Sequence, residues 1–274
     1  MNALRSDFLR KQGEFLGEGS FGRVFKGLNE ATGELIAVKQ LFLSGDSEEE
    51  VKQLRKEISV MWNLNHANIV RYLGTARTER CLYILLEYVP GGSIANMLQQ
   101  FGAFTESLLR RFVSQIVRGA EYLHSKGIIH RDIKGANVLV GVDGIAKLSD
   151  FGCSKKVYGI CTTSVEESMK VMQGSVPWMA PEVIKQTGAG FSSDIWSIGA
   201  TMIEMATGKA PWQEFSNNLA ALFHVATLIE PPPLPLNLSS EACGFLKRCL
   251  VIEARGRATA TDLLCDSFLT SPIQ

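Results

Sequence analysis

The sequence lacks an excess of either charge, because 28 lysines and arginines balance 28 aspartates and glutamates. A neutral chain has no global electrostatic reason to bind nucleic acid or an anionic membrane surface. A long apolar run is also missing, since the most apolar stretches, 83–89 and 195–208, are short or contain a glutamate. A membrane-spanning helix needs roughly 18 to 20 apolar residues. We therefore expect no nucleic-acid partner and no membrane span.

Cysteine is scarce, with six residues in 274 and none in a CxxC pair. That number is too low for a disulfide scaffold, and the spacing does not favour a metal site. The beginning of the chain, MNALRSDFLRKQGEFLG, lacks the uninterrupted apolar core of a secretory signal. We therefore expect reduced thiols and take a cytoplasmic location as the default.

The residues that are present suit a soluble globular protein, with 46% hydrophobic and 20% charged residues. The segment 15–89 contains short runs rich in β-branched and aromatic residues, separated by glycine and polar turns, which predicts a sheet. One interruption, 47–64, has apolar residues every three or four positions, which predicts an amphipathic helix. The first third of the chain is therefore expected to be β-rich.

The pattern changes after 90–92, a Pro-Gly-Gly sequence that indicates a linker or turn. A long helix is predicted where residues 108, 112, 116, 119 and 123 recur at helical spacing. Further helices are expected at 192–207, 216–228, 239–250 and 259–265. The boundary between the β-rich and helical parts lies at 87–92, and a cleft between two lobes is a natural place for a ligand.

A glycine-rich pattern, GxGxxGxV, lies between two strand-like segments. Its members are Gly17, Glu18, Gly19, Ser20, Phe21, Gly22, Arg23 and Val24. Glycines allow backbone N–H groups to approach phosphate oxygens without an intervening side chain. A dinucleotide-binding turn would open a helix at this point, whereas here a second strand-like run follows. The pattern therefore favours a hairpin that covers phosphates.

Lys39 ends the apolar run Ala37-Val38-Lys39, where a buried ammonium needs a partner. Glu57, on the expected helix, can supply it. Such an ion pair would hold the lysine as a fixed positive charge for nucleotide phosphates. A lone lysine at a strand end is otherwise a solvated side chain, so this interpretation depends on the other motifs.

Three further motifs follow in order: HRDIKGAN at 130–137, DFG at 150–152 and APE at 180–182. With the glycine pattern and Lys39, they make the chain resemble a eukaryotic protein kinase over 10–269. The resemblance implies an α+β, two-lobed fold. The expected parts are a small β-rich N-lobe with one key helix at about 10–88, a hinge at about 87–92 and a larger, mostly helical C-lobe at about 93–269.

The kinase resemblance also implies roles for individual residues and the use of ATP with Mg²⁺. Asp132 would orient the substrate hydroxyl and accept its proton, and Lys134 would contact the transferring phosphate. Asn137 and Asp150 would hold the metal ions, since their hard oxygen atoms suit Mg²⁺. The site therefore needs positioning and charge neutralisation rather than a covalent intermediate.

Several other positions resemble the adenine site and the supporting frame of the family. Glu87 and Val89 would bond the adenine ring through their backbone, with Leu86 as the gatekeeper. The apolar walls would be Leu16, Val24, Ala37 and Leu139, although ordinary core packing explains each of these equally. Asp194 resembles the aspartate that braces the catalytic loop, and Glu182 with Arg257 resembles the ion pair that ties the activation segment to the lower lobe.

Lys134 within HRDxKxxN and a hydroxyl at Ser175 resemble the Ser/Thr-specific pattern. The segments GELIAVKQL, HANIVRYLGT, LEYVPGGSI, WMAPEVI and SSDIWSIGATMIEMATGKAPW resemble mitogen-activated protein kinase kinase kinases of plant and fungal type. That resemblance implies a downstream kinase kinase as protein substrate. It also implies activation by an upstream kinase or by autophosphorylation in trans.

One departure is Pro177, which stands where relatives carry an aromatic residue. Proline fixes φ and removes a donor, so the surface that receives the substrate peptide is expected to differ. Arg131 precedes Asp132, and kinases with that arginine are often switched on by a phosphate in the activation segment. Thr163 and Ser168 are the candidate phosphosites, and a merely polar loop is the alternative.

Four functions remain to be compared. An active Ser/Thr kinase is favoured because Lys39, Glu57, Asp132, Asn137 and Asp150 are all present. A pseudokinase scaffold commonly lacks at least one of these. A Ste-type kinase outside the cascade shares the RDIKGAN loop, and a small-molecule phosphotransferase is disfavoured by the APE segment.

Overall fold

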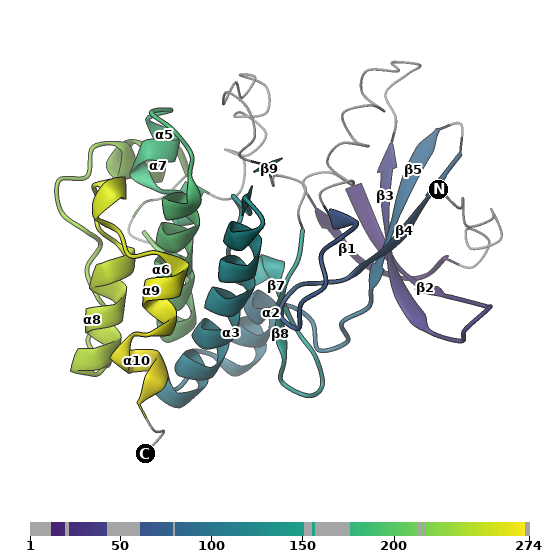
Figure 1. The fold of residues 1–274 in the computed structure, drawn as a ribbon, viewed down its shortest axis with the longest axis horizontal. Helices are drawn as coiled ribbons and strands as arrows, with labels where there is room; N and C mark the ends of the chain where they lie inside the picture. Colours follow the sequence, from purple (N-terminus) through teal and green to yellow (C-terminus); the bar gives the residue numbers. More distant parts are fainter. Residues whose placement is uncertain are drawn as a thin grey trace. The chain divides into compact units, whose positions relative to one another are not determined.

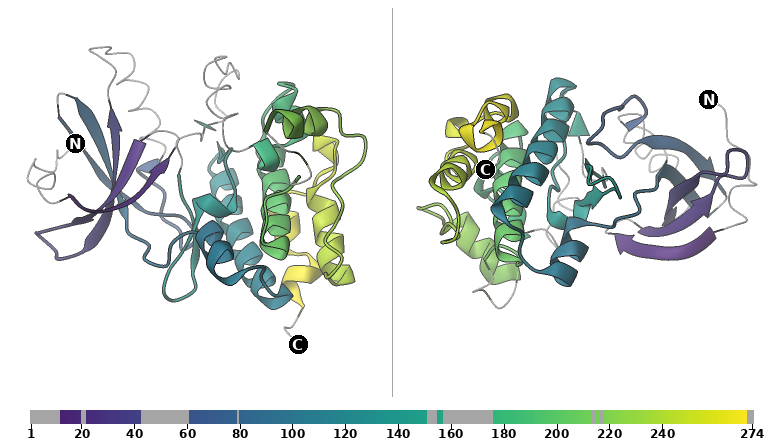
Figure 2. Two further views of the ribbon diagram at one scale, coloured as in Figure 1. Left: turned by 180° about the vertical axis from the view of Figure 1, so that it is seen from behind. Right: turned by 90° about the horizontal axis from the view of Figure 1, so that it is seen from below.

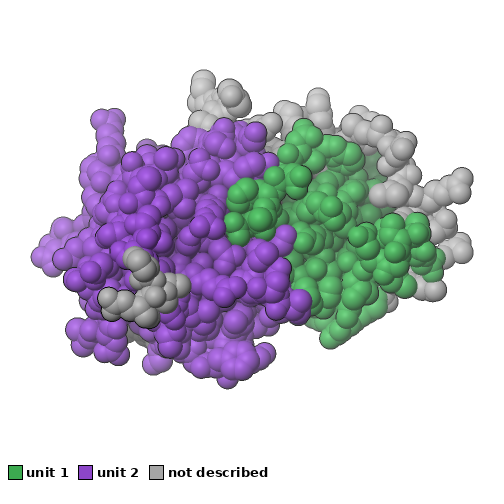
Figure 3. All heavy atoms as spheres, turned by 60° about the horizontal axis from the view of Figure 1, so that its bottom comes forward, with its two compact units in different colours: residues 1–90 green, residues 91–274 purple. Residues whose placement is uncertain are grey.

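The computed structural model describes residues 12–19, 22–42, 61–78, 80–150, 155–156, 176–212, 215 and 218–271. The chain forms two compact units, 1–90 and 91–274 (Figure 3). The first unit is built on a sheet and the second is mostly helical. The predicted α+β class is therefore confirmed.

The first unit is a five-stranded antiparallel sheet in the order β1-β2-β3-β5-β4 (Figure 1). Its strands are β1 (Gln12–Gly19), β2 (Gly22–Leu28), β3 (Leu35–Phe42), β4 (Tyr72–Arg77) and β5 (Cys81–Glu87). Ile36 and Val38 of β3 pack in one core with Leu85 of β5. Burial of these apolar residues anchors the centre of the sheet and fixes its register. The hairpin β1–β2 lies at the edge.

The predicted helix at 47–64 lies mainly outside the described residues. Its last positions are described, and Met61 and Leu64 are buried there. Trp62 stacks on Tyr72 with ring centroids 5.4 Å apart. The segment before β4 therefore contributes apolar side chains to the first unit.

The second unit contains two long helices, α3 (Glu106–Ser125) and α6 (Phe191–Thr207), which lie side by side (Figures 1 and 2). The shorter helices are α2 (Ile94–Phe101), α5 (Pro181–Ile184), α7 (Asn218–Ala226), α8 (Ser240–Cys249), α9 (Ala260–Leu264) and α10 (Ser267–Thr270). No helix in the described parts of the chain is both long and apolar enough to cross a bilayer. The helices predicted at 192–207, 216–228, 239–250 and 259–265 are confirmed.

Short strands and turns connect these helices. Strand β6 (Ile128–Ile129) pairs with β9 (Lys155–Lys156), and β7 (Val138–Val140) pairs with β8 (Ala146–Leu148). The 3₁₀ turns are η2 (Gly135–Asn137), η4 (Val176–Trp178) and η5 (Ala254–Gly256). Both strand pairs hold the two ends of the segment that carries HRDIKGAN.

The buried face of α3 differs by one residue from the prediction. Leu109 is fully buried, whereas Leu108 is only half-buried. The helix packs against both α6 and α9, so its buried face is wider than a single stripe. The other predicted positions, among them Phe112 and Ile116, are buried.

Helices α2 and α10 were not predicted, and each begins at a capping side chain. Ser93 Oγ accepts a hydrogen bond from Asn96 N at 3.2 Å, and the Asp266 carboxylate accepts one from Phe268 N at 2.9 Å. These caps satisfy backbone donors that the first turn leaves without partners. The four cysteines that the structure describes, residues 81, 243, 249 and 265, are free thiols.

Candidate active site

The segment 130–137, here called the catalytic loop, links β6 to β7 in the second unit. Asp132 is buried, and its Oδ2 accepts hydrogen bonds from Lys134 Nζ at 3.0 Å and from Asn137 Nδ2 at 2.7 Å. Asn137 Nδ2 also donates to the Asp132 carbonyl oxygen at 2.8 Å. Asp132 Oδ1 is buried and has no hydrogen-bond partner among the described residues. The geometry therefore fixes one carboxylate oxygen and leaves the other able to accept a proton or a hydrogen bond.

Asp194, in the first turn of α6, anchors the start of the catalytic loop. Its buried carboxylate accepts hydrogen bonds from His130 N and Arg131 N, each at 2.9 Å, and lies 2.8 Å from His124 Nε2. His130 is itself buried, with Nε2 at 3.0 Å from the Ser149 carbonyl oxygen. The predicted bracing contact of Asp194 is confirmed, and His124 is an additional partner.

Asn137 and Asp150 are brought near one another by the β7–β8 hairpin, in which Val138 pairs with Leu148. Ser149 donates to the Asn137 carbonyl oxygen through both its N–H, at 2.8 Å, and its hydroxyl, at 2.9 Å. Asp150 has a φ of 56°. Such a conformation is costly for a residue with a side chain and is typical of functional sites.

The residues around 137 and 150 fit a divalent cation. The amide nitrogen of Asn137 is committed to Asp132, so the amide oxygen is the atom left to bind a metal. Asp150 supplies a carboxylate and follows Ser149, whose N–H and hydroxyl bind the Asn137 carbonyl oxygen. Hard oxygen donors of this kind suit Mg²⁺, which keeps several waters in its shell.

Glu204, near the end of α6, is a site residue that the sequence analysis did not identify. Its Oε2 accepts hydrogen bonds from Gly135 N at 2.8 Å and from Trp178 Nε1 at 2.9 Å. Burial raises the pKa of this carboxyl, while the Gly135 and Trp178 hydrogen bonds and the Lys134 charge oppose the shift. A single glutamate inside the apolar stretch 195–208 was the available signal.

The predicted ion pair between Glu182 and Arg257 is confirmed. Both guanidinium ends bind the carboxylate, with Nη1 2.6 Å from Oε1 and Nη2 2.7 Å from Oε2. The Arg257 side chain is buried, and its guanidinium lies over the Trp196 ring at 5.0 Å. A bidentate pair of this kind fixes orientation as well as distance.

The described glycine-rich residues lie at the ends of β1 and β2 in the first unit, where Gly19 pairs with Gly22 and Glu18 with Arg23. Glu18 Oε1 lies 3.6 Å from Arg23 Nε, and both side chains are exposed. Ser20 and Phe21 lie outside the described residues.

Two of the glycines have different surroundings. A Cβ on Gly22, which has a φ of 150°, would overlap the Gln40 carbonyl oxygen, whereas a Cβ on Gly17 would meet nothing within 4 Å. Gly22 is therefore required by packing within the sheet. Gly17, in contrast, has no neighbouring atom at the position that a side chain would occupy.

Lys39 lies on β3 and is buried, opposite Val24 of β2 and Ile84 of β5. Ala37 lies on the same strand, opposite Leu86. Val24 and Ala37 are half-buried. These positions place the predicted nucleotide residues of the first unit on three adjacent strands.

Three further predicted residues of the nucleotide site lie on other elements or outside the described residues, and their roles stay predictions. Leu16 on β1 is largely exposed, and Leu139 is on β7 of the second unit. Glu57 lies outside the described residues, so its ion pair with Lys39 stays a prediction.

The first residue of the predicted hinge, Glu87, lies at the end of β5. Glu87 N donates to the Arg71 carbonyl oxygen at 2.9 Å, and the Glu87 carboxylate accepts from Arg71 N at 3.1 Å. The Glu87 N–H is therefore used within the sheet, so an adenine contact at this residue falls to its carbonyl oxygen. Val89 is buried.

The activation segment is largely beyond the described residues. Phe151, Gly152, Thr163, Ser168 and Ser175 all lie there. Pro177 is described, half-buried within η4, and the expected effect of this proline on peptide preference stays a prediction.

A model of the protein kinase domain matches residues 10–269. The chain belongs to the protein kinase family. The use of ATP with a divalent metal follows from this membership. Within this kinase domain, the catalytic loop and the residues that brace it form the described part of the candidate active site.

Relatives of this kinase domain are named as mitogen-activated protein kinase kinase kinases. Mitogen-activated protein kinase kinase kinase 2 of Arabidopsis thaliana is 49% identical over 266 residues, 95% of this chain and 40% of that protein. Kinase kinase kinase A of Dictyostelium discoideum is 47% identical, over 94% of this chain and 28% of that protein. Kinase kinase kinase 3 of Homo sapiens is 43% identical, over 94% and 41%. The chain spans well under half the length of these relatives.

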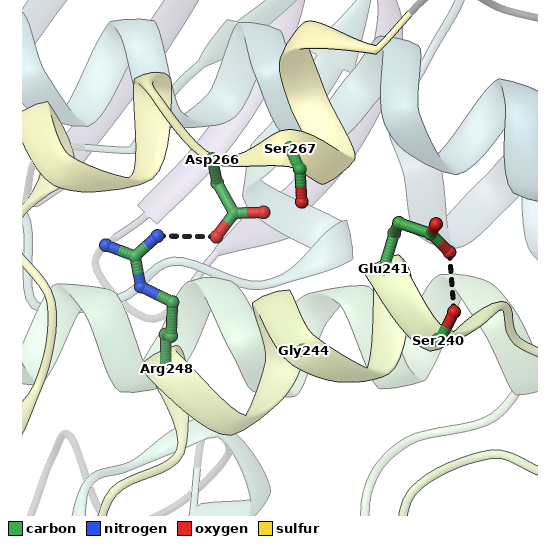
Figure 4. Close-up of a pocket in the computed structure, with 6 residues that line it drawn as sticks. All are labelled: Ser240, Glu241, Gly244, Arg248, Asp266 and Ser267. Carbon is green, nitrogen blue, oxygen red and sulfur yellow. Dashed lines mark hydrogen bonds and ion pairs between the residues drawn. The ribbon is translucent and has the colours of Figure 1, made fainter.

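A cavity of about 310 Å³ lies in the second unit, between α8 and α10 (Figure 4). None of its lining residues belongs to the catalytic loop. Its charged side chains partner their neighbours, since Arg248 Nη1 lies 2.5 Å from Asp266 Oδ2 and Glu241 accepts from the Ser240 hydroxyl at 2.8 Å. The cavity is therefore a separate feature from the kinase site.

Proposed function

We propose that this kinase domain transfers the γ-phosphate of Mg·ATP to serine or threonine hydroxyls of a protein. The observation that carries the proposal is the arrangement of Asp132, with Oδ2 held by Lys134 and Asn137 and Oδ1 buried without a described partner. A carboxylate held in this way can orient a hydroxyl and accept its proton.

The proposed reaction forms a bond between the substrate oxygen and the γ-phosphorus and breaks the bond to the ADP oxygen. Asp132 accepts the proton of the hydroxyl, and Lys134 contacts the transferring phosphate. Asn137 and Asp150 would hold Mg²⁺, which supplies neutralisation of the phosphate charge when bound. The fixed donors around Asp132 keep its position constant, so little reorganisation is needed at the moment of transfer.

The proposed nucleotide site uses the first unit. The β1–β2 hairpin at 17–24 and Lys39 would bind the phosphates, with Glu57 as the partner of the lysine. Glu87 and Val89 would bond the adenine ring, between apolar walls formed by Leu16, Val24, Ala37 and Leu139. The proposed domain covers 10–269, with lobes at 10–88 and 93–269 and a hinge at 87–92.

We propose further that the protein acts as a mitogen-activated protein kinase kinase kinase and phosphorylates a downstream kinase kinase. The names of relatives that are 43–49% identical over nearly the whole chain support this position in the kinase cascade. Activation by an upstream kinase or in trans, through Thr163 or Ser168, belongs to the same proposal, as does a cytoplasmic location. The alternatives are a scaffold without transfer and a related kinase outside this cascade.

The test is transfer of labelled phosphate from Mg·ATP to two acceptors, a generic basic protein and a catalytically inactive kinase kinase. Wild type is compared with Asp132→Asn. Label on serine or threonine of the kinase kinase that is lost in the variant is the expected result. Labelling of the basic protein alone would contradict the proposed action on a kinase kinase. If the folded, phosphorylated protein binds ATP and transfers no phosphate, the scaffold without transfer is the remaining alternative.

A further inference from the structure

The connection from α7 to α8, at the left of Figure 1, is rich in proline, with the sequence PPPLP at 231–235. Proline fixes φ at about −65°, and a residue that precedes proline is restricted to an extended conformation. Every residue from 230 to 235 is a proline or precedes one. In the structure, 231–235 belong to neither a helix nor a strand. The sequence therefore favours a polyproline II conformation for 230–235, which together with Leu236 is here called the proline segment.

The proline segment exposes one of its edges completely. A polyproline II helix has about three residues per turn, so Glu230 and Pro233 lie on one edge, which Leu236 continues. All three residues are exposed, and Leu236 is 99% exposed. Pro231, on a second edge, is exposed as well, whereas Pro232 is buried. The segment therefore rests on the second unit at Pro232 and presents proline and leucine side chains to solvent.

The end of the proline segment that leads to α8 is fixed to the rest of the second unit. The N–H and the hydroxyl of Ser239 each donate to the Glu106 carboxylate of α3 at 2.7 Å. Ser239 Oγ also accepts a hydrogen bond from Ala242 N at 3.1 Å and so caps α8. A ligand that is rigid before binding loses little conformational entropy when a partner binds. The proline segment is therefore a pre-formed ligand.

A stiff connection between two helices explains the prolines but not the apolar side chains beside them. Ile229 is 91% exposed on one side of the prolines, and Leu236 is almost fully exposed on the other. A single exposed apolar residue is ordinary on a protein surface. Here, exposed apolar residues follow one another closely along the chain, and apolar patches of this kind mark interaction sites. The proline segment therefore has the features of a ligand as well as those of a connection.

We propose that the proline segment is a docking site for a partner domain that binds polyproline II helices in a groove lined with aromatic rings. Such grooves bind the pre-formed helix through its proline and neighbouring apolar side chains, here Pro231, Pro233 and Leu236. Glu230 is the only charged residue in 229–237. Since like charges across an interface repel, the partner has a basic side chain beside its groove. No residue of the docking site belongs to the catalytic loop, so the partner and the proposed substrate use different surfaces.

The test is an NMR titration of the isotopically labelled chain with a panel of purified SH3, WW and EVH1 domains. Proline has no amide N–H, so the expected result is a shift of the amide signals of Ile229, Glu230, Leu234 and Leu236 by at least one domain. Poly-L-proline, which forms the same type of helix, should displace the bound domain. The proposal is overturned if no domain shifts these signals or if poly-L-proline leaves the bound domain in place.

Variants of the exposed edge measure its contribution to binding. Pro233→Ala and Leu236→Ala should each lower the affinity for the domain about tenfold, because each removes apolar contact with the groove. Val142→Ala is the matched control, since Val142 is an 88% exposed apolar residue in the connection between β7 and β8. All three variants should keep the wild-type melting temperature. An equal loss of affinity in the control, or wild-type affinity in both variants of the segment, would contradict the proposal.

A change of charge tests the expected basic side chain of the partner. Glu230→Lys should weaken binding more than Glu230→Gln, because it places two positive charges side by side. Stronger binding by Glu230→Lys would overturn the basic character assigned to the partner.

The docking site is separable from the proposed phosphate transfer. The titration uses neither ATP nor an acceptor, so its outcome does not depend on the kinase function. Leu236→Ala should label the basic protein at the wild-type rate while its affinity for the domain falls. A parallel loss of labelling would show that the proline segment serves catalysis rather than docking, which contradicts the proposal.

Discussion

The predicted catalytic residues of the second unit and the β1–β2 hairpin of the first unit are held in opposite ways. In the second unit, Asp132 and Asp194 are buried, and backbone and side-chain donors fix their carboxylates. In the first unit, Leu16, Glu18 and Arg23 lie on a hairpin with exposed side chains. The difference indicates that folding fixes the position of the catalytic carboxylate, whereas the side chains of the predicted phosphate-binding hairpin remain exposed to solvent.

The largest effect is expected at the catalytic carboxylate. Asp132→Asn keeps the size of the side chain and removes the proton acceptor, so phosphate transfer should fall by about 10²–10⁴-fold. Stability and ATP affinity should stay close to wild type, because the first unit is unchanged. Transfer assays and nucleotide-induced shifts of the melting temperature measure both. Phosphate transfer at the wild-type rate would show that Asp132 is not the proton acceptor.

The second-largest effect is expected at Asp194, which anchors the catalytic loop of the second unit. Asp194→Ala leaves two buried backbone N–H groups and His124 without their acceptor, which should cost about 3–5 kcal/mol in the free energy of unfolding. Urea denaturation measures the loss. A cost below about 1 kcal/mol would show that the loop is held by other contacts.

A pair of glycine variants sharpens the comparison within the first unit. Gly22→Ala should destabilise the sheet by about 1–3 kcal/mol, because its Cβ would overlap the Gln40 carbonyl oxygen. Gly17→Ala meets no neighbouring atom but places a side chain at a φ of 159°, so it should cost less stability than Gly22→Ala and raise the KM for ATP. Melting temperatures and ATP titrations separate the two. Equal effects on stability would contradict the distinction.

The pH dependence of stability tests the burial of Glu204. A raised pKa in the folded state means that the stability contributed by this group is full below its ordinary value of 4.5 and is lost as pH rises through the folded value. Glu204→Gln lacks this titration. The unfolding free energy of the wild type relative to the variant should therefore fall with increasing pH across that window. A constant difference between the two urea curves would contradict the shift.

The smallest effect is expected at the exposed ion pair of the hairpin. Glu18→Gln removes a contact of 3.6 Å between two exposed side chains, so the stability change should stay below about 1 kcal/mol. The change should shrink further in high salt. A larger loss in thermal unfolding would show that the hairpin is held more firmly than its exposure indicates.

The sequence predicts the parts of the site whose chemistry demands particular residue types. Asp132, Lys134 and Asn137 were identified in this way, and the structure brings them together. Glu204 was missed because its contact depends on which face of α6 meets the catalytic loop, a tertiary contact that no local pattern encodes. For Glu204, a carboxylate within an apolar stretch was the only sign.

The fold was predicted from the sequence about as fully as the candidate site. Periodicity located α3 and α6, but it placed Leu108 rather than Leu109 in the core, because α3 is covered on more than one side. Helix α2 has only eight residues, and Ser93 at its cap was the usable signal. Short helices have too few periods to be recognised from apolar spacing alone.

Backbone conformation at two residues, one in the catalytic loop and one after the β7–β8 hairpin, has a consequence for protein design. Arg131 and Asp150 have φ values of 72° and 56°, which glycine adopts at far lower cost. A sequence optimised for the stability of this backbone alone would place glycine at both positions. Such a protein would keep the architecture and lose the groups that distinguish an enzyme from an inert scaffold.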